Sequence, residues 1–199
     1  MLKSIFATMI LLVATSVHAA DVYKIDAKES SVSWKGAKKM GSSHNGGISV
    51  KEGQVQVDKK GLITSGNIAI DMATITNEDL KGSPEFQKKL LGHLSNEDFF
   101  NVTKFPTSTF KITSVASNPK AKDEVTVKGE LTMIGQTKPI EFPAKVTVAN
   151  GVMTGEALVK VDRTKWGLKY GSGNIFKELA ADKIIADEFE LNLKLVAKK

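Results

Sequence analysis

The 199-residue chain has 28 basic and 22 acidic side chains, a formal net charge of +6, and no cysteine. The lack of cysteine excludes disulfide bonds and a lipoprotein anchor attached through an N-terminal cysteine. Arg163 is the only arginine and the lysines are dispersed. This pattern argues against a nucleic-acid reader, because such proteins gather arginine and lysine in basic patches.

Residues 1–19 have the pattern of a secretory signal peptide. Lys3 supplies the positive charge, an apolar stretch follows, and Ala19 is the small residue before the expected cut. A retained membrane anchor is the alternative, but the apolar stretch is short for a membrane span. We therefore expect a free, soluble, exported domain of residues 20–199, either periplasmic or secreted.

The mature chain alternates apolar and polar residues in a series of segments, which is typical of half-buried β-strands. Their order is Tyr23–Asp26, Ser30–Lys39, Ile48–Val57 with a bend or hairpin turn inside it, Asn67–Met72, a strand through Phe110, Val125–Met133, Ile140–Val148, Val152–Arg163 and Glu188–Leu195. Asn150-Gly151 predicts a tight hairpin, because both residues tolerate positive φ. Pro139 and Pro143 predict an edge, a bulge or a strand end.

One segment has the periodicity of a helix. Ser83 is a plausible N-cap, Pro84 suits the first helical position, and Phe86, Leu90 and Leu94 form an apolar stripe four residues apart. Aromatic residues follow the helix. Such a helix could close the end of something hollow, or it could cover one end of an ordinary core.

This pattern predicts an all-β fold with one or two short helices. A sheet with a single helix must bury its apolar face mostly against itself, as a closed antiparallel barrel or as a sandwich. An eight-stranded barrel is wide enough for one small ligand. Periodicity alone does not choose between barrel and sandwich.

The residues offer little for catalysis. His44 and His93 are the histidines of the mature chain, and neither a zinc-binding HExxH motif nor a Gly-x-Ser-x-Gly elbow occurs. A metal site built from both histidines and a carboxylate is one alternative. Arg163 either pins the loop that follows it or contacts a ligand, since its planar guanidinium suits both roles. His93 either caps the helix or contacts a ligand.

Several motifs occur in a fixed order along the mature chain. They are Tyr23-Lys24-Ile25-Asp26, Ser43-His44-Asn45-Gly46, the run from His93 to Phe100, Lys104-Phe105-Pro106, the run from Gly129 to Ile140, and Arg163 with Trp166-Gly167. In this order the chain resembles the YceI-like family of bacterial exported polyisoprenoid-binding proteins. It departs from many members at Trp34-Lys35-Gly36, at Trp166 and at Tyr170–Asn174.

The resemblance implies an extended, lipocalin-like antiparallel β-barrel of about eight strands with a helical segment at one end. Its tunnel would hold a long apolar chain such as a polyprenyl quinone, a polyprenyl phosphate or a fatty-acid derivative. It implies no catalytic activity and no cofactor other than this bound lipid. Family members are often dimers, so a homodimer is one expected arrangement.

We therefore expect a binding protein that transports, stores or sequesters a lipid. The candidate lipid-contacting residues are Trp34, Phe86, Leu90, Leu94, Phe99, Phe100, Phe110, Leu131, Met133, Phe142 and Trp166. The candidate polar mouth is His44, His93 and Arg163. Each apolar candidate could instead serve packing alone. The alternative functions are a lipid- or quinone-modifying enzyme using His44 and His93, and a secreted structural β-protein with a filled core.

Overall fold

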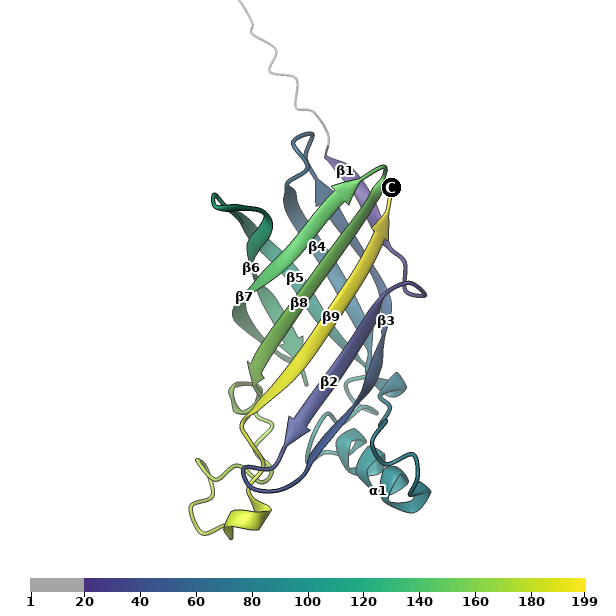
Figure 1. The fold of residues 1–199 in the computed structure, drawn as a ribbon. Helices are drawn as coiled ribbons and strands as arrows, with labels where there is room; N and C mark the ends of the chain where they lie inside the picture. Colours follow the sequence, from purple (N-terminus) through teal and green to yellow (C-terminus); the bar gives the residue numbers. More distant parts are fainter. Residues whose placement is uncertain (1–19) are drawn as a thin grey trace, which may run out of the picture.

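Nine antiparallel strands make the barrel in the computed structural model, which describes residues 20–199 apart from the side chain of Lys122 (Figure 1). The predicted signal peptide lies outside the described residues. The strands are β1 (Asp21–Ile25), β2 (Ser31–Ala37), β3 (Ser43–Val57), β4 (Ile63–Asp71), β5 (Thr107–Asn118), β6 (Ala121–Met133), β7 (Gln136–Ala149), β8 (Val152–Asp162) and β9 (Glu188–Lys198). The helical elements are α1 (Pro84–Ser95) and the 3-10 turns η1 (Met72–Thr74), η2 (Arg163–Trp166) and η3 (Ala181–Lys183).

The barrel closes because β2 pairs with both β3 and β9. The short strand β1 lies between the same two neighbours farther along the barrel, with Tyr23 opposite Val55 and Lys24 opposite Lys198. Strands β1 and β2 thus share one position in the wall, and the nine strands make an eight-stranded barrel. The predicted fold class is confirmed, and the sandwich is excluded.

Local backbone features follow from the sequence. Asn150 and Gly151 both have positive φ, at 52° and 74°, as the hairpin prediction requires. The segment around Gly53 is neither a break nor a hairpin. It belongs to the single strand β3, and a register shift between Val50 and Glu52 bends that strand.

Strand β7 has a free edge over more than half of its length. It pairs with β8 only from Lys145, opposite Glu156, to its last residue, and from there toward α1 the two strands diverge (Figure 1). Pro139 and Pro143 lie in the unpaired part, where a missing backbone N–H costs no ladder hydrogen bond. The predicted edge is confirmed.

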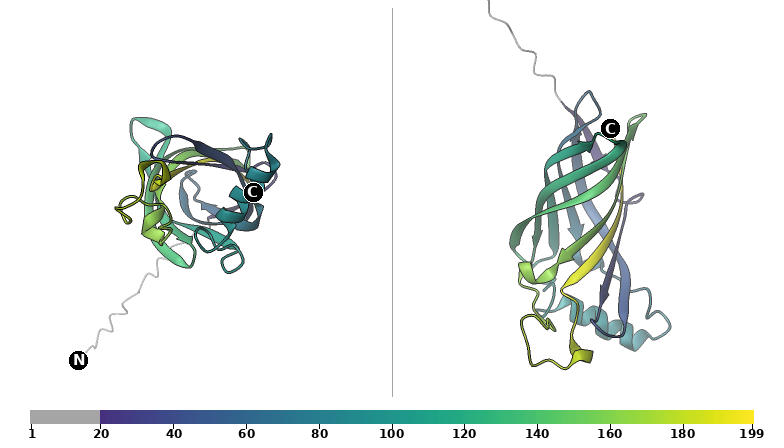
Figure 2. Two further views of the ribbon diagram at one scale, coloured as in Figure 1. Left: turned by 90° about the horizontal axis from the view of Figure 1, so that it is seen from below. Right: turned by 60° about the vertical axis from the view of Figure 1, so that its left-hand side comes forward.

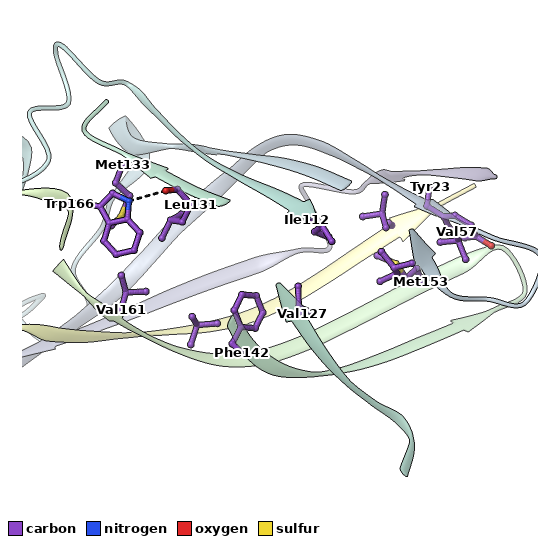
Figure 3. Close-up of a cluster of buried hydrophobic side chains, with 14 residues drawn as sticks. Tyr23, Val57, Ile112, Val127, Leu131, Met133, Phe142, Met153, Val161 and Trp166 are labelled. Atoms are coloured by element: carbon purple, nitrogen blue, oxygen red, sulfur yellow. Dashed lines mark hydrogen bonds between the residues drawn. The ribbon is translucent and has the colours of Figure 1, made fainter. Parts of the chain in front are cut away.

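The interior is filled in the half of the barrel away from α1. Tyr23, Val57, Val127 and Met153 are among the buried side chains that occupy this half (Figure 3). Phe110 packs against both buried clusters, and its ring lies 5.5 Å from that of Phe142, between centroids. The mostly apolar cavity of the described residues lies at the end of the barrel next to α1, called the helical end below.

Candidate functional site

A cavity of about 950 Å³ occupies the helical end of the barrel. Its lining is mostly apolar, and its size falls within the usual range for sites that bury a small organic ligand. Several strands contribute apolar residues to the lining, among them Val32 from β2, Ile48 from β3, Ile70 from β4 and Leu191 from β9. Phe110 and Phe142 are not in the lining. Phe110 lies opposite the lining residue Leu131 in the neighbouring strand, and its ring contacts that of Phe142. We infer that these two rings form the floor of the cavity.

Alternate residues of the strands form the cavity wall, as a period of two requires. Leu131 and Met133 come from β6, and Trp34 comes from β2. The indole N–H of Trp34 donates a hydrogen bond of 3.0 Å to the carbonyl of Thr76, which fixes the ring. The wall therefore presents an apolar surface with its one indole donor already satisfied.

Helix α1 and the segment after it cover the cavity. Leu90 and Leu94 line the cavity together with Phe99 and Phe100, yet none of the residues of α1 is buried. A helix that covered a filled core would bury its apolar stripe, so α1 covers a hollow. Phe86 continues the stripe by one turn, but it is 68% exposed and lies outside the lining.

A network of hydrogen bonds holds the chain before α1 against β3. The Asp79 carboxylate accepts from the backbone N–H of Asn45 at 2.8 Å, and its other oxygen lies 2.7 Å from Nδ1 of His44. The buried amide of Asn77 donates to the Asn45 carbonyl at 3.1 Å and to Asp79 at 2.6 Å. Burial alone would raise the pKa of Asp79. The hydrogen bonds from Asn45, His44 and Asn77 outweigh it and hold this pKa below its usual value.

Gly46 explains why the Ser43–Gly46 motif needs glycine. A Cβ at this position would lie 1.8 Å from the Thr76 carbonyl oxygen, so only a hydrogen atom fits there. The N–H of Thr76 donates to the carbonyl of Gly47 at 2.9 Å. The motif is thus a clamp that positions the cover of the cavity, and His44 both joins the clamp and lines the cavity.

His93 connects α1 to the loop between η2 and β9. Its Nε2 lies 3.0 Å from a carboxylate oxygen of Asp98, and its ring meets the rings of Phe99 and Tyr170 edge to face, with centroids 4.9 and 4.6 Å away. The phenol ring of Tyr170 also lines the cavity. These aromatic contacts span the mouth from the helix to the loop.

Arg163 holds the loop between η2 and β9 through hydrogen bonds to its backbone. The guanidinium is buried and donates to the carbonyls of Leu168, Ala186 and Ile185 at 2.6, 3.0 and 3.2 Å. Burial lowers its pKa, and the carboxylates of Asp187, 3.7 Å away, and Asp162 oppose that shift. Arg163 borders the cavity, but three of its N–H groups hold the loop.

The cavity brings together most, but not all, of the residues expected to contact a ligand. Those in its lining are Trp34, Leu90, Leu94, Phe99, Phe100, Leu131, Met133, His44, His93 and Arg163. Phe86, Phe110, Phe142 and Trp166 are outside it. Trp166 is buried in the wall, where its indole N–H donates to the Leu131 carbonyl at 2.9 Å (Figure 3).

Sequence reasoning missed parts of the mouth. Phe176 lines the cavity from a loop without periodicity, so no pattern identified it. Tyr170, from the same loop, was noted only as a departure from many family members that could reshape the mouth, and it also lines the cavity. Asn77 and Asp79 act through hydrogen bonds to a motif more than thirty residues earlier, which no local signal shows.

Between residues 20 and 199, no three His, Asp or Glu side chains lie close enough together to hold a metal ion. Over the same range, no helix has the length and apolar character needed to cross a membrane.

The closed barrel with one hollow, apolar, covered end defines a class of β-barrels with an internal ligand-sized cavity. The sequence model of the YceI-like domain matches residues 23–197, and the chain belongs to the YceI-like family. The resemblance seen in the motifs is confirmed.

Curated relatives agree with this assignment. A UPF0312 protein of Vibrio cholerae is 28% identical over 147 residues, which is 72% of each chain. Protein YceI of Shigella flexneri is 46% identical over 54 residues, so the match spans only 27% of each chain.

Solved structures show the same fold. BcnA of Burkholderia cenocepacia is 25% identical with a TM-score of 0.66, covering 87% of this chain and 99% of its own. A polyisoprenoid binding domain from Saccharophagus degradans is 13% identical with a TM-score of 0.61, covering 91% and 99%. The YceI protein of Campylobacter jejuni is 16% identical with a TM-score of 0.56, covering 100% and 99%.

Proposed function

We propose that this protein binds one lipid with a long apolar chain in the cavity, and that it carries, stores or sequesters this lipid outside the cytoplasm. The observation that supports the proposal is a mostly apolar cavity of about 950 Å³ covered by helix α1, none of whose residues is buried. The structural neighbour described as a polyisoprenoid binding domain supports the same class of ligand.

The binding energy would come from removing the apolar chain from water. A buried CH₂-sized group contributes about 0.8 kcal/mol, so one five-carbon isoprenoid unit contributes roughly 3–4 kcal/mol before ordering costs. A few such units suffice for tight binding. A polyprenyl chain and a fatty-acyl chain both fit this requirement, since neither needs hydrogen bonds.

The lipid's head group would lie at the mouth, where the polar lining is found. The lining contains four carboxylates, those of Glu97, Asp98, Glu178 and Glu188. Lys38, Lys169 and Lys183 also border the cavity, as do His44 and His93. A quinone, a phosphate or a carboxylate could each accept hydrogen bonds from these donors. We propose a binding role rather than a catalytic one, because the lining of the cavity is mostly apolar; His44 and His93 each lie beside a carboxylate, of Asp79 and Asp98 respectively.

Purification from the exporting host, solvent extraction and mass spectrometry test the proposal. We expect one apolar-chain lipid per chain, removed by extraction and restored by adding back a polyprenyl or fatty-acyl lipid. A protein that carries no lipid and also refuses both kinds of chain would contradict the proposal.

A further inference from the structure

Large apolar side chains are exposed at the helical end of the barrel. Met40 between β2 and β3 is 64% exposed and Phe86 on α1 is 68% exposed, and the loop between η2 and β9 exposes Tyr170, Ile175 and Phe176. We call these five side chains the apolar rim. They come from three separate segments that lie together at this end in both side views (Figures 1 and 2).

The rim combines these side chains with lysines. Glu85 and Glu178 lie beside Phe86 and Lys177, but lysines are more numerous along the rim. Lys39 precedes Met40, Lys88 follows Phe86 by two residues, and Lys177 follows Phe176. These lysines are exposed, and none of the three forms an ion pair with any residue between 20 and 199. Apolar tips next to free lysines are typical of surfaces that lie in the interface of an anionic bilayer.

The rim is continuous with the cavity. Tyr170 and Phe176 line the cavity and are also among the exposed large apolar residues, at 45% and 39%. An apolar chain that left a bilayer here would pass from one apolar surface to the next without crossing water. The opposite end of the barrel exposes fewer such side chains, Val22 and Leu62, and it is filled.

We propose that the apolar rim docks on the surface of a lipid bilayer with anionic head groups, with the mouth of the cavity facing the membrane. The proposal rests on the proposed function, because the docked mouth would serve the exchange of the bound lipid. The rim suits a bilayer better than a folded protein partner, because it consists of separate segments flanked by lysines and not of one flat apolar face.

Vesicle co-sedimentation tests the docking with protein purified after export. Phosphatidylglycerol-rich vesicles should retain the protein, and phosphatidylcholine vesicles should retain it several-fold less. The triple variant Met40→Ser, Phe86→Ser, Ile175→Ser should lower vesicle binding by at least about tenfold, because it removes the inserted side chains outside the cavity. The matched double variant Val22→Ser, Leu62→Ser, at the filled end, should change binding by less than about twofold.

A second assay separates docking from lipid binding. Uptake of a fluorescent medium-chain fatty acid from vesicle-free solution should be the same, within about twofold, in the wild type and the triple variant. A wild-type protein that takes up the fatty acid but binds no vesicles would contradict the docking proposal and still support the proposed lipid-binding function. Vesicle binding without uptake would support the docking and overturn the function. Self-association in sedimentation equilibrium that the triple variant abolishes, with vesicle binding unchanged, would make the rim a contact between copies and overturn the docking.

Discussion

The imidazole of His93 on α1 and the phenol ring of Tyr170 meet edge to face with 4.6 Å between their centroids. This contact joins the helix to the loop between η2 and β9 across the mouth of the cavity. Helix α1 buries none of its residues, and the side chain of Gln87 also ties it to the Asn77 carbonyl at 2.6 Å. We expect the contact between His93 and Tyr170 to slow the opening of the mouth.

Tyr170→Ala should speed the release of a bound lipid. Aromatic pairs of this geometry contribute about 0.5–1.5 kcal/mol, which corresponds to roughly a 2- to 10-fold faster dissociation rate if the contact breaks on opening. Stopped-flow displacement of a fluorescent fatty acid measures this rate. Tyr170→Phe keeps the ring and should release at the wild-type rate; equal rates for all three proteins would show that the contact does not gate the mouth.

Leu90→Arg should weaken lipid uptake far more than Lys88→Glu. Leu90 lines the cavity from α1, whereas Lys88 is exposed on the same helix. A charged side chain in the apolar lining loses hydration without gaining a partner. Titration with the same fluorescent fatty acid should show a loss of at least about tenfold for the first variant and less than about twofold for the second. Equal effects would mean that this face of α1 does not contact the lipid.

Phe110→Ala should deepen the cavity and favour longer chains. Its ring and that of Phe142 close the floor, so its removal extends the space toward the filled half, at a cost of about 3–5 kcal/mol of stability. Affinities for fatty acids of increasing length should peak at a longer chain than in the wild type. Val57→Ala, in the filled half, should destabilise the barrel without moving this optimum. An unchanged optimum in Phe110→Ala would place the floor elsewhere.

Gly46→Ala should disturb the clamp under α1 while leaving the barrel closed. The new methyl group would meet the Thr76 carbonyl oxygen at 1.8 Å, and overpacking of this kind typically costs about 1–3 kcal/mol. Hydrogen exchange should show lost protection in residues 76–100 and unchanged protection in β6 to β9. Gly155→Ala, where a Cβ meets nothing within 4 Å, is the matched control. Full protection of α1 in Gly46→Ala would contradict the clamp.

The clamp should also loosen in acid. The pKa of Asp79 is lower in the folded protein than in the unfolded chain, where it lies near its ordinary value of about 3.9. The ionised Asp79 carboxylate therefore stabilises the folded clamp above about pH 4, and this stabilisation is lost as the pH falls through the lower, folded-state pKa. Hydrogen exchange of α1, measured against pH and corrected for intrinsic rates, should show this loss. Asp79→Asn should remove the pH dependence, and a variant that keeps it would assign the effect to another group.

Much of the fold could be predicted from the sequence because its signals are local. The alternation of apolar and polar residues predicted the strands, and Asn150-Gly151 predicted a hairpin. Pro139 and Pro143 indicated the free edge of β7. Closure could not be predicted, since it depends on the pairing of β2 with β9, far apart in the chain. Alternation is the same in a barrel and in a sandwich.

The residues of the candidate site could be predicted only in the helix and strands, where apolar residues recur with a regular period. The stripe on α1 identified Leu90 and Leu94, but it also included Phe86, because spacing defines a face and not where the cavity ends. Tyr170 comes from an irregular loop. Arg163 was expected either to hold this loop or to contact a ligand, and only the structure shows its three carbonyl partners.

Fluorescence quenching by a brominated fatty acid tests the central claim most directly, because the chain has two tryptophans and Trp34 lines the cavity. In the Trp166→Phe variant, Trp34 is the only tryptophan, so selective excitation of tryptophan reports on Trp34 alone. A lipid chain in the cavity predicts strong quenching that saturates at one ligand per protein and is competed by the unbrominated acid. Saturable binding of the acid without quenching of Trp34 would place the ligand elsewhere and contradict the account.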